Sequence, residues 1–383
     1  MPDVHAVRAF LDEHHLVLAD RIGDFCQREI APLPQPDDDH AARVQAREIL
    51  AALGGAGWFQ PILDRDLRAC VLIRETLAAT SPLADAVFAL QALGTMPILL
   101  AGTDQQRDRW LPGIADGRTM AAFAMTEPEA GSDVAGMAAT AARDGDYYVL
   151  RGTKTLISNA GIADFYTVFA STDRTKGKDG ISCFVIPANE PGLKFVKPQV
   201  LSAPHPLGEI AFHDCRIPAT ARLGDEGGGL RLGLATLDQL RATVAAAACG
   251  MAERGLHEAL RHARARRQFG KAISEFQLVQ DKLARMTTQL TAARLLTYRA
   301  AWEKDTGAER VTVESAMAKA FATEAAQRVV DDAVQILGGR GVLADHPVDR
   351  LYRSVRALRI YEGTTEIQYL VIANHLIKGA DNA

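Results

Sequence analysis

Apolar residues recur every three or four positions through the first part of the chain, as far as about Gly117. The runs at residues 7–14 and 72–77 are two clear examples of this spacing. Such a period is typical of amphipathic helices, and strand-like runs are nearly absent here. The pattern therefore predicts a helical N-terminal domain over residues 1–118.

The pattern changes at Met120, where short runs rich in β-branched and aromatic residues begin. The longest of these runs start at Tyr147, Phe165, Ile181, Gly192 and Glu209. Turn-forming pairs at 144–145 and 191–192 separate the runs at the spacing expected of an antiparallel sandwich or barrel. We expect a central antiparallel β domain over residues 119–225, which is a typical domain size.

The helical period returns after residues 227–229 and persists nearly to the end of the chain. Ser274 and Gln277 have the spacing of a capping box and predict the start of a long helix that Gly307 ends. A second helix carries an apolar stripe through residues 317–329. The fold class predicted is a multidomain α+β protein in which a C-terminal four-helix bundle, residues 226–383, follows the β domain.

Bulk composition excludes several classes of protein. The chain has 383 residues, of which 48% are hydrophobic and 23% charged, so a disordered chain is excluded. Lys and Arg number 43 against 47 Asp and Glu, and a net charge of −4 gives no positive field for nucleic acid. The five cysteines form no CxxC pair, which argues against disulfides and a cysteine-based zinc site and favours a reducing compartment.

The longest stretch without a charged residue covers positions 86–103. Polar and helix-breaking residues interrupt it at Gln91, Gly94, Thr95 and Pro97, so we expect a pair of buried helices rather than a membrane span. The N-terminus lacks the basic start and apolar core of a signal peptide. A cytoplasmic location is therefore expected.

Some familiar motifs are incomplete. The glycines at 227–229 do not extend to a GxGxxG, because Leu232 occupies the last position, and a nicotinamide site is unsupported. His257 and Glu258 begin like a zinc-protease helix, but Arg261 stands where the second histidine belongs. The basic run at residues 261–267 fits a solvated helix face, with an anion contact as the alternative.

The segment 124–136 has the features of a ligand-binding loop. Thr126 and Ser132 offer hydroxyl groups, Gly131 permits close backbone approach, and Pro128 does not fit a central strand. From these residues alone, an ordinary strand-to-turn transition and a site for a polar planar ligand are equally good readings.

Two further groups of residues lie near the C-terminus. The glycines at 338, 339 and 341 end a helix and expose backbone N–H groups, which suits a pyrophosphate. Glu362 lies between the apolar pair 360–361 and Ile367, next to Gly363. A carboxyl held against apolar neighbours has a raised pKa and suits a general base, although a solvated glutamate beside a turn shows the same pattern.

Four segments in this order resemble the acyl-CoA dehydrogenase family: residues 125–133, 266–271, 335–341 and 360–368. The resemblance covers nearly the whole chain, and the order of helices, β domain and helices agrees with it. It implies that FAD is held between the β domain and the C-terminal helices, with help from a neighbouring subunit. It also implies that the enzyme removes two hydrogens across Cα and Cβ of an acyl thioester, acyl-CoA or carrier-bound.

The resemblance assigns roles residue by residue. The residues implied to bind the cofactor are Met125, Thr126, Ser158, Arg266, Gln268, Phe269, Gln335, Gly339, Thr364 and Glu366. The residues implied to contact the substrate are Ser132, Asp238, Arg241, Tyr361 and Gly363. For Asp238 and Arg241, helix capping and surface pairing are alternatives. Because the flavin site is shared, a homodimer or homotetramer is implied, with an electron-transfer flavoprotein as a candidate acceptor.

Glu362 matches the catalytic base of the family. Removal of a proton α to a thioester needs a positioned carboxylate and donors at the carbonyl oxygen, where enolate charge develops. In the family these donors are the N–H of the base and a ribityl hydroxyl of FAD, and the flavin takes the β-hydrogen as hydride.

Some positions depart from the family pattern. Leu156 stands where many members have a bulky aromatic beside the flavin, Ser354 replaces an acidic residue, and residues 200–207 lack the usual glycine. These departures suggest a divergent member. A flavin oxidase or monooxygenase on the same scaffold is the first alternative, and a non-catalytic helical scaffold is the second.

Overall fold

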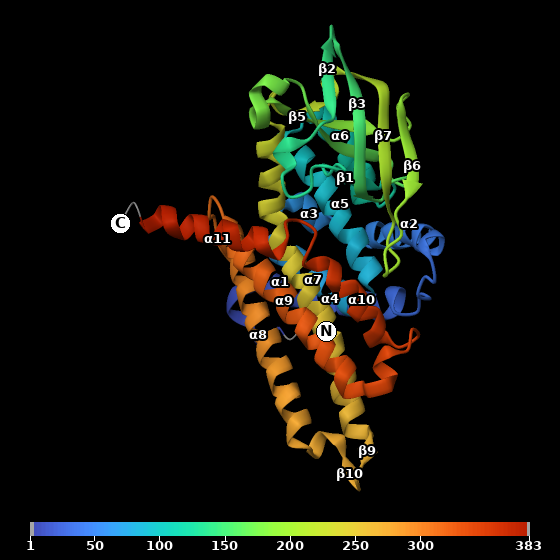
Figure 1. The fold of residues 1–383 in the computed structure, drawn as a ribbon, viewed down its shortest axis with the longest axis vertical. Coiled ribbons are helices and arrows are strands. Elements are labelled where there is room, and N and C mark those ends of the chain that lie inside the picture. Colours follow the sequence, from blue (N-terminus) through green and yellow to red (C-terminus); the bar gives the residue numbers. More distant parts are fainter. Residues whose placement is uncertain (1–3, 381–383) are drawn as a thin grey trace. The chain divides into compact units, whose positions relative to one another are not determined.

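The computed structural model describes residues 4–380 and divides the chain into two compact units (Figure 1). Unit 1 consists of Met1–Leu33, Asp66–Asp85 and Asp238–Ala383. Unit 2 consists of Pro34–Arg65 and Ala86–Leu237. The boundaries predicted at residues 118 and 225 stay a prediction.

A mixed sheet forms the centre of unit 2. Its strands are β1 (Ala121–Ala124), β2 (Thr140–Asp144), β3 (Tyr147–Ser158), β4 (Phe165–Ser171), β5 (Ile181–Pro187), β6 (Leu193–Pro198), β7 (Leu207–Pro218) and β8 (Arg222–Leu223). The order is β6-β7-β3-β2-β4-β5-β8, with β1 paired to β4. The sequence predicted strands at the long runs rich in β-branched and aromatic residues, and the structure has strands there. The pairs β1–β4 and β2–β4 are parallel, so the sheet is not purely antiparallel as expected.

An irregular stretch near the end of β3 shapes the part of the sheet that carries predicted site residues. The pairing of β3 with β7 shifts register between Lys154 and Ile157. Within that stretch Leu156 has a left-handed backbone, with φ of 55°. Because a bulge interrupts the alternation of side chains along a strand, the residues after it are re-aimed relative to those before it.

The main helices of unit 2 come before the sheet in the sequence. They are α2 (Asp39–Gly55), α3 (Gln60–Asp64), most of α5 (Pro82–Ala101) and α6 (Asp104–Ala115). The predicted helix pair at 86–103 is wrong, because α5 is one helix. Gly94 lets α5 approach β1, where an added Cβ would come within 2.7 Å of Ala121 Cβ, and the Thr95 hydroxyl donates to the Gln91 carbonyl.

The length and composition of α5 alone would allow it to cross a membrane, and no other helix among residues 4–380 meets that test. Its most apolar window is 78% buried inside the fold, as in the core helix of a soluble protein. The Thr167 hydroxyl donates to the Gly94 carbonyl at 2.8 Å, which ties α5 to strand β4. The burial of α5 therefore comes from packing within the protein.

Unit 1 is helical. Its main elements are α1 (Glu13–Phe25), η2 (Cys26–Ile30), α4 (Leu67–Thr80), most of α7 (Gly229–Ala265), α8 (Gln277–Asp305), α9 (Thr312–Leu337), η7 (Gly338–Val342), α10 (Pro347–Leu358) and α11 (Thr365–Ala380). Helix α9 packs against α8, α10 and α11, and a short hairpin of β9 (Arg267–Gln268) and β10 (Lys271–Ala272) joins α7 to η6 and α8 (Figure 1). The remaining short helices of unit 1 are η1 (Arg8–Phe10) and η6 (Ile273–Glu275), and those of unit 2 are η3 (Val134–Gly136), η4 (Arg174–Gly180) and η5 (Ala219–Ala221).

The start of α8 corrects the sequence prediction. Ser274 lies in η6 and does not cap the long helix, which begins after Phe276. The capping interaction is one turn earlier, where the Ala272 N–H donates to the Glu275 carboxylate at 2.9 Å. The predicted end is confirmed: α8 stops at Asp305, and Gly307 follows with φ of 105°.

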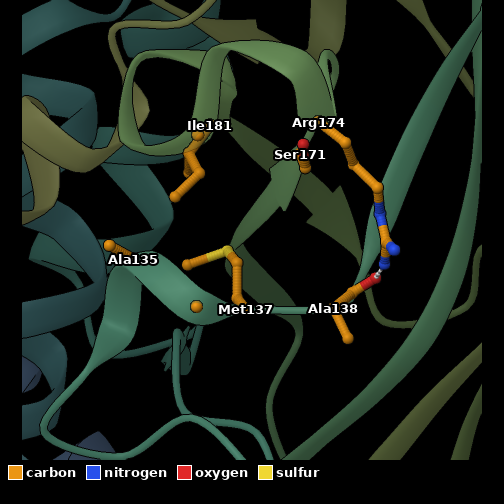
Figure 2. A pocket seen from close by; sticks show the side chains of 8 residues that line it. Ala135, Met137, Ala138, Ser171, Arg174 and Ile181 are labelled. Atoms are coloured by element: carbon orange, nitrogen blue, oxygen red, sulfur yellow. Dashed lines mark hydrogen bonds between the residues drawn. The ribbon is translucent and has the colours of Figure 1, made fainter.

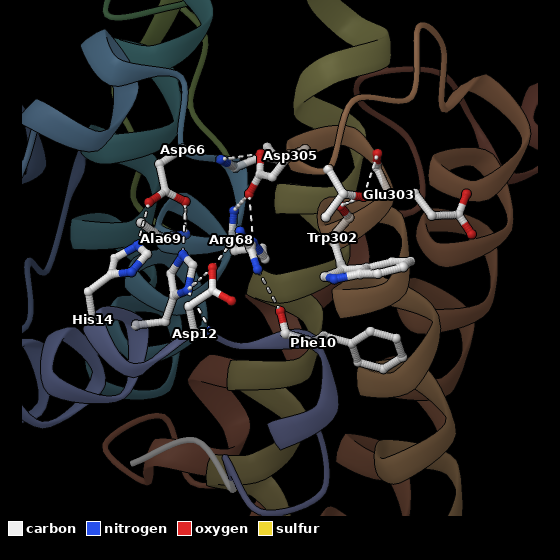
Figure 3. A network of polar contacts seen from close by, with 12 residues as sticks. Phe10, Asp12, His14, Asp66, Arg68, Ala69, Trp302, Glu303 and Asp305 are labelled. Atoms are coloured by element: carbon white, nitrogen blue, oxygen red, sulfur yellow. Dashed lines mark hydrogen bonds and ion pairs between the residues drawn. The ribbon is translucent and has the colours of Figure 1, made fainter.

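A polar network fastens α1 and α8 to the start of α4 (Figure 3). Asp66 caps α4 by accepting the Ala69 N–H, and its other partners are the Nε2 atoms of His15 at 3.1 Å and His14 at 3.3 Å. His15 Nδ1 accepts the Asp12 N–H, so its Nε2 is the nitrogen that donates to Asp66. Both ring nitrogens of His15 are thus used within the protein.

Candidate active site

Glu362 lies on a left-handed turn between α10 and α11. Its φ is 54°, and Gly363 follows with φ of 89°. A left-handed backbone costs a residue with a side chain about 1 kcal/mol, so the surroundings must hold this turn in place. They do so through the Thr365 N–H, which donates to the Arg359 carbonyl at 3.0 Å, and through Thr364, whose hydroxyl caps α11 by accepting the Ile367 N–H.

The carboxyl of Glu362 is buried. Its Oε2 atom has no hydrogen-bond partner among the described residues. Burial raises the pKa of Glu362, while the positive charges of Arg74, Lys319 and Arg241 act against that rise. The sequence prediction of a raised pKa is therefore confirmed. Its physical setting differs, because buried cations accompany the apolar neighbours that the sequence suggested.

Arg74 is one of these cations, and sequence reasoning did not identify it. The residue is 2% exposed on α4, and its guanidinium donates two bonds to Asp85, at 2.7 and 3.0 Å. A third bond runs to the Thr243 hydroxyl at 2.8 Å. Burial opposes the charge on Arg74, but the Asp85 carboxylate outweighs it and raises the pKa further above its usual range. Tyr361, beside Glu362, has its hydroxyl hydrogen-bonded to Arg74, although burial raises the pKa of that phenol.

Arg241 and Asp238 form a buried ion pair in the interior of α7. Arg241 is only 5% exposed, and the Thr312 hydroxyl of α9 donates to the second Asp238 oxygen at 2.8 Å. Neither residue caps a helix or lies in a surface pair, so those alternatives are wrong. The Arg241 Nε atom is buried without a partner among residues 4–380, which leaves one donor of this guanidinium unused.

The carbonyl of Gly363 is a fixed point of the turn. Gln368 Nε2, from the first turns of α11, donates to it at 3.0 Å, and Lys319 Nζ from α9 donates at 2.6 Å. A Cβ on Gly363 would lie 2.5 Å from Gln368 Nε2. The backbone angle therefore favours glycine here, and a Cβ would have to displace the end of the Gln368 side chain from the Gly363 carbonyl.

The loop after β1 is held by a buried ion pair in unit 2. Lys154 Nζ donates to the Met125 carbonyl at 3.0 Å and to the Glu127 carboxylate at 2.8 Å. Glu127 also accepts the N–H groups of Ala138 and Ala139. Thr126 lies between these anchors, half-buried, and its carbonyl accepts the Thr155 N–H. The two ends of the predicted ligand loop are thus fixed to the sheet.

The bulge on β3 presents Leu156 and Ser158. Leu156 is 55% exposed, and its N–H donates to the Gln199 side chain at 2.7 Å. The Ser158 hydroxyl is 2.8 Å from His205 Nε2. Burial lowers the pKa of His205 to about 4, and the charge of Arg43 adds to this effect, so the ring is neutral near pH 7.

Ser132 is exposed. A cavity of about 370 Å³ opens in unit 2 beside residues that follow it in the chain (Figure 2). Its lining consists of Ala135, Gly136, Met137, Ala138, Ser171, Arg174, Gly177 and Ile181. Arg174 closes one side by donating to the Ala138 carbonyl. The cavity therefore continues the loop that carries one of the predicted substrate contacts.

The hairpin between α7 and α8 carries exposed predicted cofactor residues. Phe269 is 94% exposed with φ of 50°, and Gly270 follows with φ of 81°. Arg266 and Gln268 beside it are also exposed. The Phe269 ring meets the Phe276 ring edge-on, with 6.1 Å between their centroids, and this contact leaves most of the apolar ring exposed at the tip of the turn.

Positive charge gathers near the ends of α7 and α9. Burial lowers the pKa of His262, and the charges of Arg340, Arg266 and His346 lower it further. Helix α9 ends at Leu337 with Gly338 at φ of 60°, as the glycine pattern predicted. Gln335 and Gly339 are exposed at this end. The positive charges of Arg340 and Arg266 beside this exposed glycine turn suit a diphosphate.

The structure thus assembles the predicted residues into separate groups. In unit 1, Tyr361 and Gly363 adjoin Glu362 in the chain, the charge of Arg241 acts on its carboxyl, and Asp238 pairs with Arg241. The predicted residues of the hairpin and of 335–339 are exposed. In unit 2, Met125, Thr126 and Ser158 lie on the loop and strand that Lys154 and the β3 bulge shape. The residues that sequence reasoning missed are Arg74, Asp85, Thr243, Lys319, Gln368, Lys154 and His205.

Comparison with known proteins identifies the class. The chain matches the N-terminal, middle and C-terminal domains of acyl-CoA dehydrogenase over residues 12–118, 122–215 and 227–377. It belongs to the acyl-CoA dehydrogenase family of FAD-dependent oxidoreductases.

Individual relatives agree with this assignment. The chain is 39% identical over 380 residues to a 3-(aryl)acrylate reductase of Clostridium sporogenes, covering 96% of this chain and 100% of that protein. It is similar to butyryl-CoA dehydrogenase of Megasphaera elsdenii at 34% identity and a TM-score of 0.90, covering 96% and 99% of the two chains. It is also similar to PigA in its FAD complex, at 29% identity and a TM-score of 0.87, covering 96% and 98%.

Proposed function

We propose that this chain uses Glu362 as the base that removes the α-proton of an acyl-CoA thioester. The observation that carries the proposal is the buried Glu362 carboxyl, whose Oε2 atom has no partner among the described residues. A buried carboxylate without a hydrogen bond is costly, so a fold that keeps one has a use for the free oxygen. A base of raised pKa holds a proton well at neutral pH after taking it.

The surrounding residues provide for the charge that develops during this step. The backbone N–H of Glu362 donates to no other described residue, and it is therefore free for the thioester oxygen, where enolate charge forms. The buried cations Arg74 and Arg241 favour the ionised carboxylate before the proton arrives. FAD, when bound, accepts the β-hydrogen as hydride.

The cofactor fits groups of residues that the fold leaves available. Met125, Thr126 and Ser158 would hold the flavin ring. Thr364 and Glu366 would add contacts at the start of α11. The exposed residues Arg266, Gln268, Phe269, Gln335 and Gly339 would bind the diphosphate and adenosine, and the cations around His262 support this role. Ser132, exposed on the loop whose following residues line the cavity, would contact the thioester arm.

We propose that the enzyme is a homodimer or homotetramer that shares its flavin sites. Phe269, at the tip of the hairpin, offers an apolar ring to a second chain. Helix α11 extends away from the bundle and exposes Tyr369, Leu370, Leu376 and Ile377 (Figure 1). Apolar surface of this kind marks an interaction site. Gel filtration with light scattering tests the oligomeric state, and a monomer that binds FAD fully would contradict it.

Anaerobic mixing tests the activity. The purified protein is mixed with saturated acyl-CoA thioesters, including butyryl-CoA and 3-phenylpropanoyl-CoA, and with the matching acyl-carrier proteins. We expect the visible flavin band to bleach with one or more of the CoA esters and to yield one enoyl thioester per FAD. The 3-arylpropanoyl ester is included because the Clostridium relative is an arylacrylate reductase. FAD-loaded protein that no thioester bleaches would contradict the proposal.

The flavin oxidase is kept as a second candidate because Leu156 is 55% exposed where a bulky aromatic is common. Mixing the reduced enzyme with dioxygen and with an electron-transfer flavoprotein separates the two candidates. Slow reoxidation by dioxygen with fast transfer to the flavoprotein supports the dehydrogenase. Fast formation of peroxide supports the oxidase. All five cysteines are buried as thiols, which fits the expected cytoplasmic location.

A further inference from the structure

Lys319 occupies an unusual position for a lysine. It lies in the middle of α9, its side chain is 0% exposed, and it is among the largest fully buried side chains of the described fold. Removing an ammonium group from water costs several kcal/mol, and a methionine or leucine would fill a similar volume without that cost. A buried lysine in an otherwise alanine-rich core therefore calls for a reason other than packing.

Among residues 4–380, the ammonium of Lys319 makes one hydrogen bond, and it leads to the turn of Glu362 and Gly363. Lys319 Nζ donates to the Gly363 carbonyl at 2.6 Å, the same oxygen that Gln368 Nε2 approaches at 3.0 Å. The carbonyl is thereby held from α9 and from α11 at once. Because Glu362 and Gly363 are both left-handed, a displaced carbonyl would let the turn relax and re-aim the Glu362 carboxyl.

The charge of Lys319 also faces Glu362. Burial lowers the pKa of Lys319 to about 8, and the negative charge of Glu362 is the largest influence that opposes this fall. The other charged groups that act on the ammonium are Arg241 on α7, Glu366 on α11 and Glu324 on α9. In the reverse direction, Lys319, together with Arg74 and Arg241, limits the rise in the pKa of Glu362, and Asp85 acts against these cations.

We propose that Lys319 is a positioning residue for the proton transfer, which fixes the Glu362–Gly363 turn through the Gly363 carbonyl and keeps the Glu362 carboxylate ionised in its buried site. This role rests on the proposed function of Glu362. It differs from a packing role in one measurable way. Removal of the ammonium charge raises the pKa of Glu362, so less of the base is ionised at a given pH.

The test compares Lys319→Met with the wild-type enzyme, both loaded with FAD. The rate of flavin reduction by a saturating acyl-CoA is measured anaerobically from pH 5 to 9. We expect a fall of about 100-fold at neutral pH, the effect of a misplaced catalytic group. We also expect the acid limb of the pH profile to move to higher pH. Equilibrium binding of a non-reactive thioether analogue should stay within about threefold, since Lys319 does not touch the substrate.

Matched variants separate the proposal from a structural effect. Lys282→Met removes another lysine of unit 1, one that pairs with Asp332 and not with the Gly363 carbonyl, and should leave the profile unchanged. Lys319→Arg keeps the charge and should recover the acid limb even if its rate stays low. Hydrogen exchange of the peptide covering residues 358–368 should be faster in Lys319→Met than in Lys282→Met.

The outcomes are distinct. A Lys319→Met enzyme that reduces its flavin within threefold of the wild type, with an unmoved acid limb, would overturn the proposal. If Lys319→Met fails to fold, Lys319→Arg and Lys319→Gln provide the same comparison of charged with neutral side chains. Failure of the proposed function is detected separately, because Glu362→Gln would then reduce its flavin at the wild-type rate whatever Lys319 does.

Discussion

Gln368 Nε2 lies 3.0 Å from the Gly363 carbonyl oxygen, on the side where a side chain at Gly363 would stand. Gly363→Ala places a Cβ 2.5 Å from that nitrogen at φ of 89°. We expect flavin reduction to slow by about 100-fold because the Glu362 carboxyl is displaced. FAD content should be retained.

Gly145→Ala is the matched control for this prediction. Gly145 has φ of 58° on a hairpin, and an added Cβ there meets nothing within 4 Å. Its backbone strain of about 1 kcal/mol should lower stability and leave flavin reduction unchanged. Equal rates in Gly363→Ala and Gly145→Ala would show that the contact with Gln368 does not position the turn.

The Arg74–Asp85 pair should be a large determinant of stability. Arg74→Met leaves the buried Asp85 carboxylate unpaired, at a cost of about 3–5 kcal/mol in the free energy of unfolding. The double variant Arg74→Met/Asp85→Leu should recover part of that loss, because no unpaired charge remains. Urea unfolding measures both. Arg285→Met, which breaks an exposed pair with Asp281, should change stability by less than about 0.5 kcal/mol. A similar small loss for Arg74→Met would contradict the account.

His205 predicts a pH dependence of stability. Its pKa is about 4 in the folded protein, below the ordinary value of 6.5, so the folded state binds its proton less readily than the unfolded state. The neutral His205 ring therefore contributes to the free energy of unfolding above pH 6.5. This contribution, on the order of 2 kcal/mol, is lost as the pH falls towards 4. His205→Gln keeps a polar contact for Ser158 and should flatten this part of the profile. Identical slopes between pH 7 and 4.5 in the two proteins would contradict the assignment.

Gly250 permits the close approach of α7 to α4. An added Cβ would lie 2.0 Å from the Glu75 carbonyl oxygen, so Gly250→Ala should destabilise the protein by about 2–4 kcal/mol through displaced backbone. Gly255→Ala, on the same helix, meets its nearest atom at 3.4 Å and should be neutral or stabilising by up to about 1 kcal/mol. Thermal unfolding compares them, and equal transition temperatures would argue against tight packing at Gly250.

The strands with β-branched and aromatic residues could be read from the sequence, because their composition is that of a half-buried sheet. Strands β1 and β2 could not, since β1 is mostly alanine and β2 combines alanine with charged residues, neither of which favours a sheet by itself. The same holds for α5, where local breakers such as Pro97 argued for two helices and packing against β1 kept one. Tertiary contacts decided these elements.

The site was predictable where a motif carries the chemistry, as at Glu362 and Gly363. It was not predictable where a residue acts through distant partners. Arg74 and Lys319 stand in apolar helical patterns, and nothing in their neighbouring sequence shows that they approach the 361–363 turn. Buried cations of this kind become visible only when the fold brings their partners, Asp85 and the Gly363 carbonyl, within hydrogen-bond distance.

Glu362→Gln tests the central claim most directly. The substitution keeps the size of the side chain and removes the base, and Glu303→Gln, at a half-buried position of α8 that pairs with Arg299, serves as its control. The rate of flavin bleaching by an acyl-CoA is measured anaerobically at equal FAD content. The account predicts that Glu362→Gln binds FAD and the acyl-CoA but bleaches at least about 1,000-fold more slowly than Glu303→Gln, within the range for loss of a general base. Bleaching of both variants at the wild-type rate would contradict it.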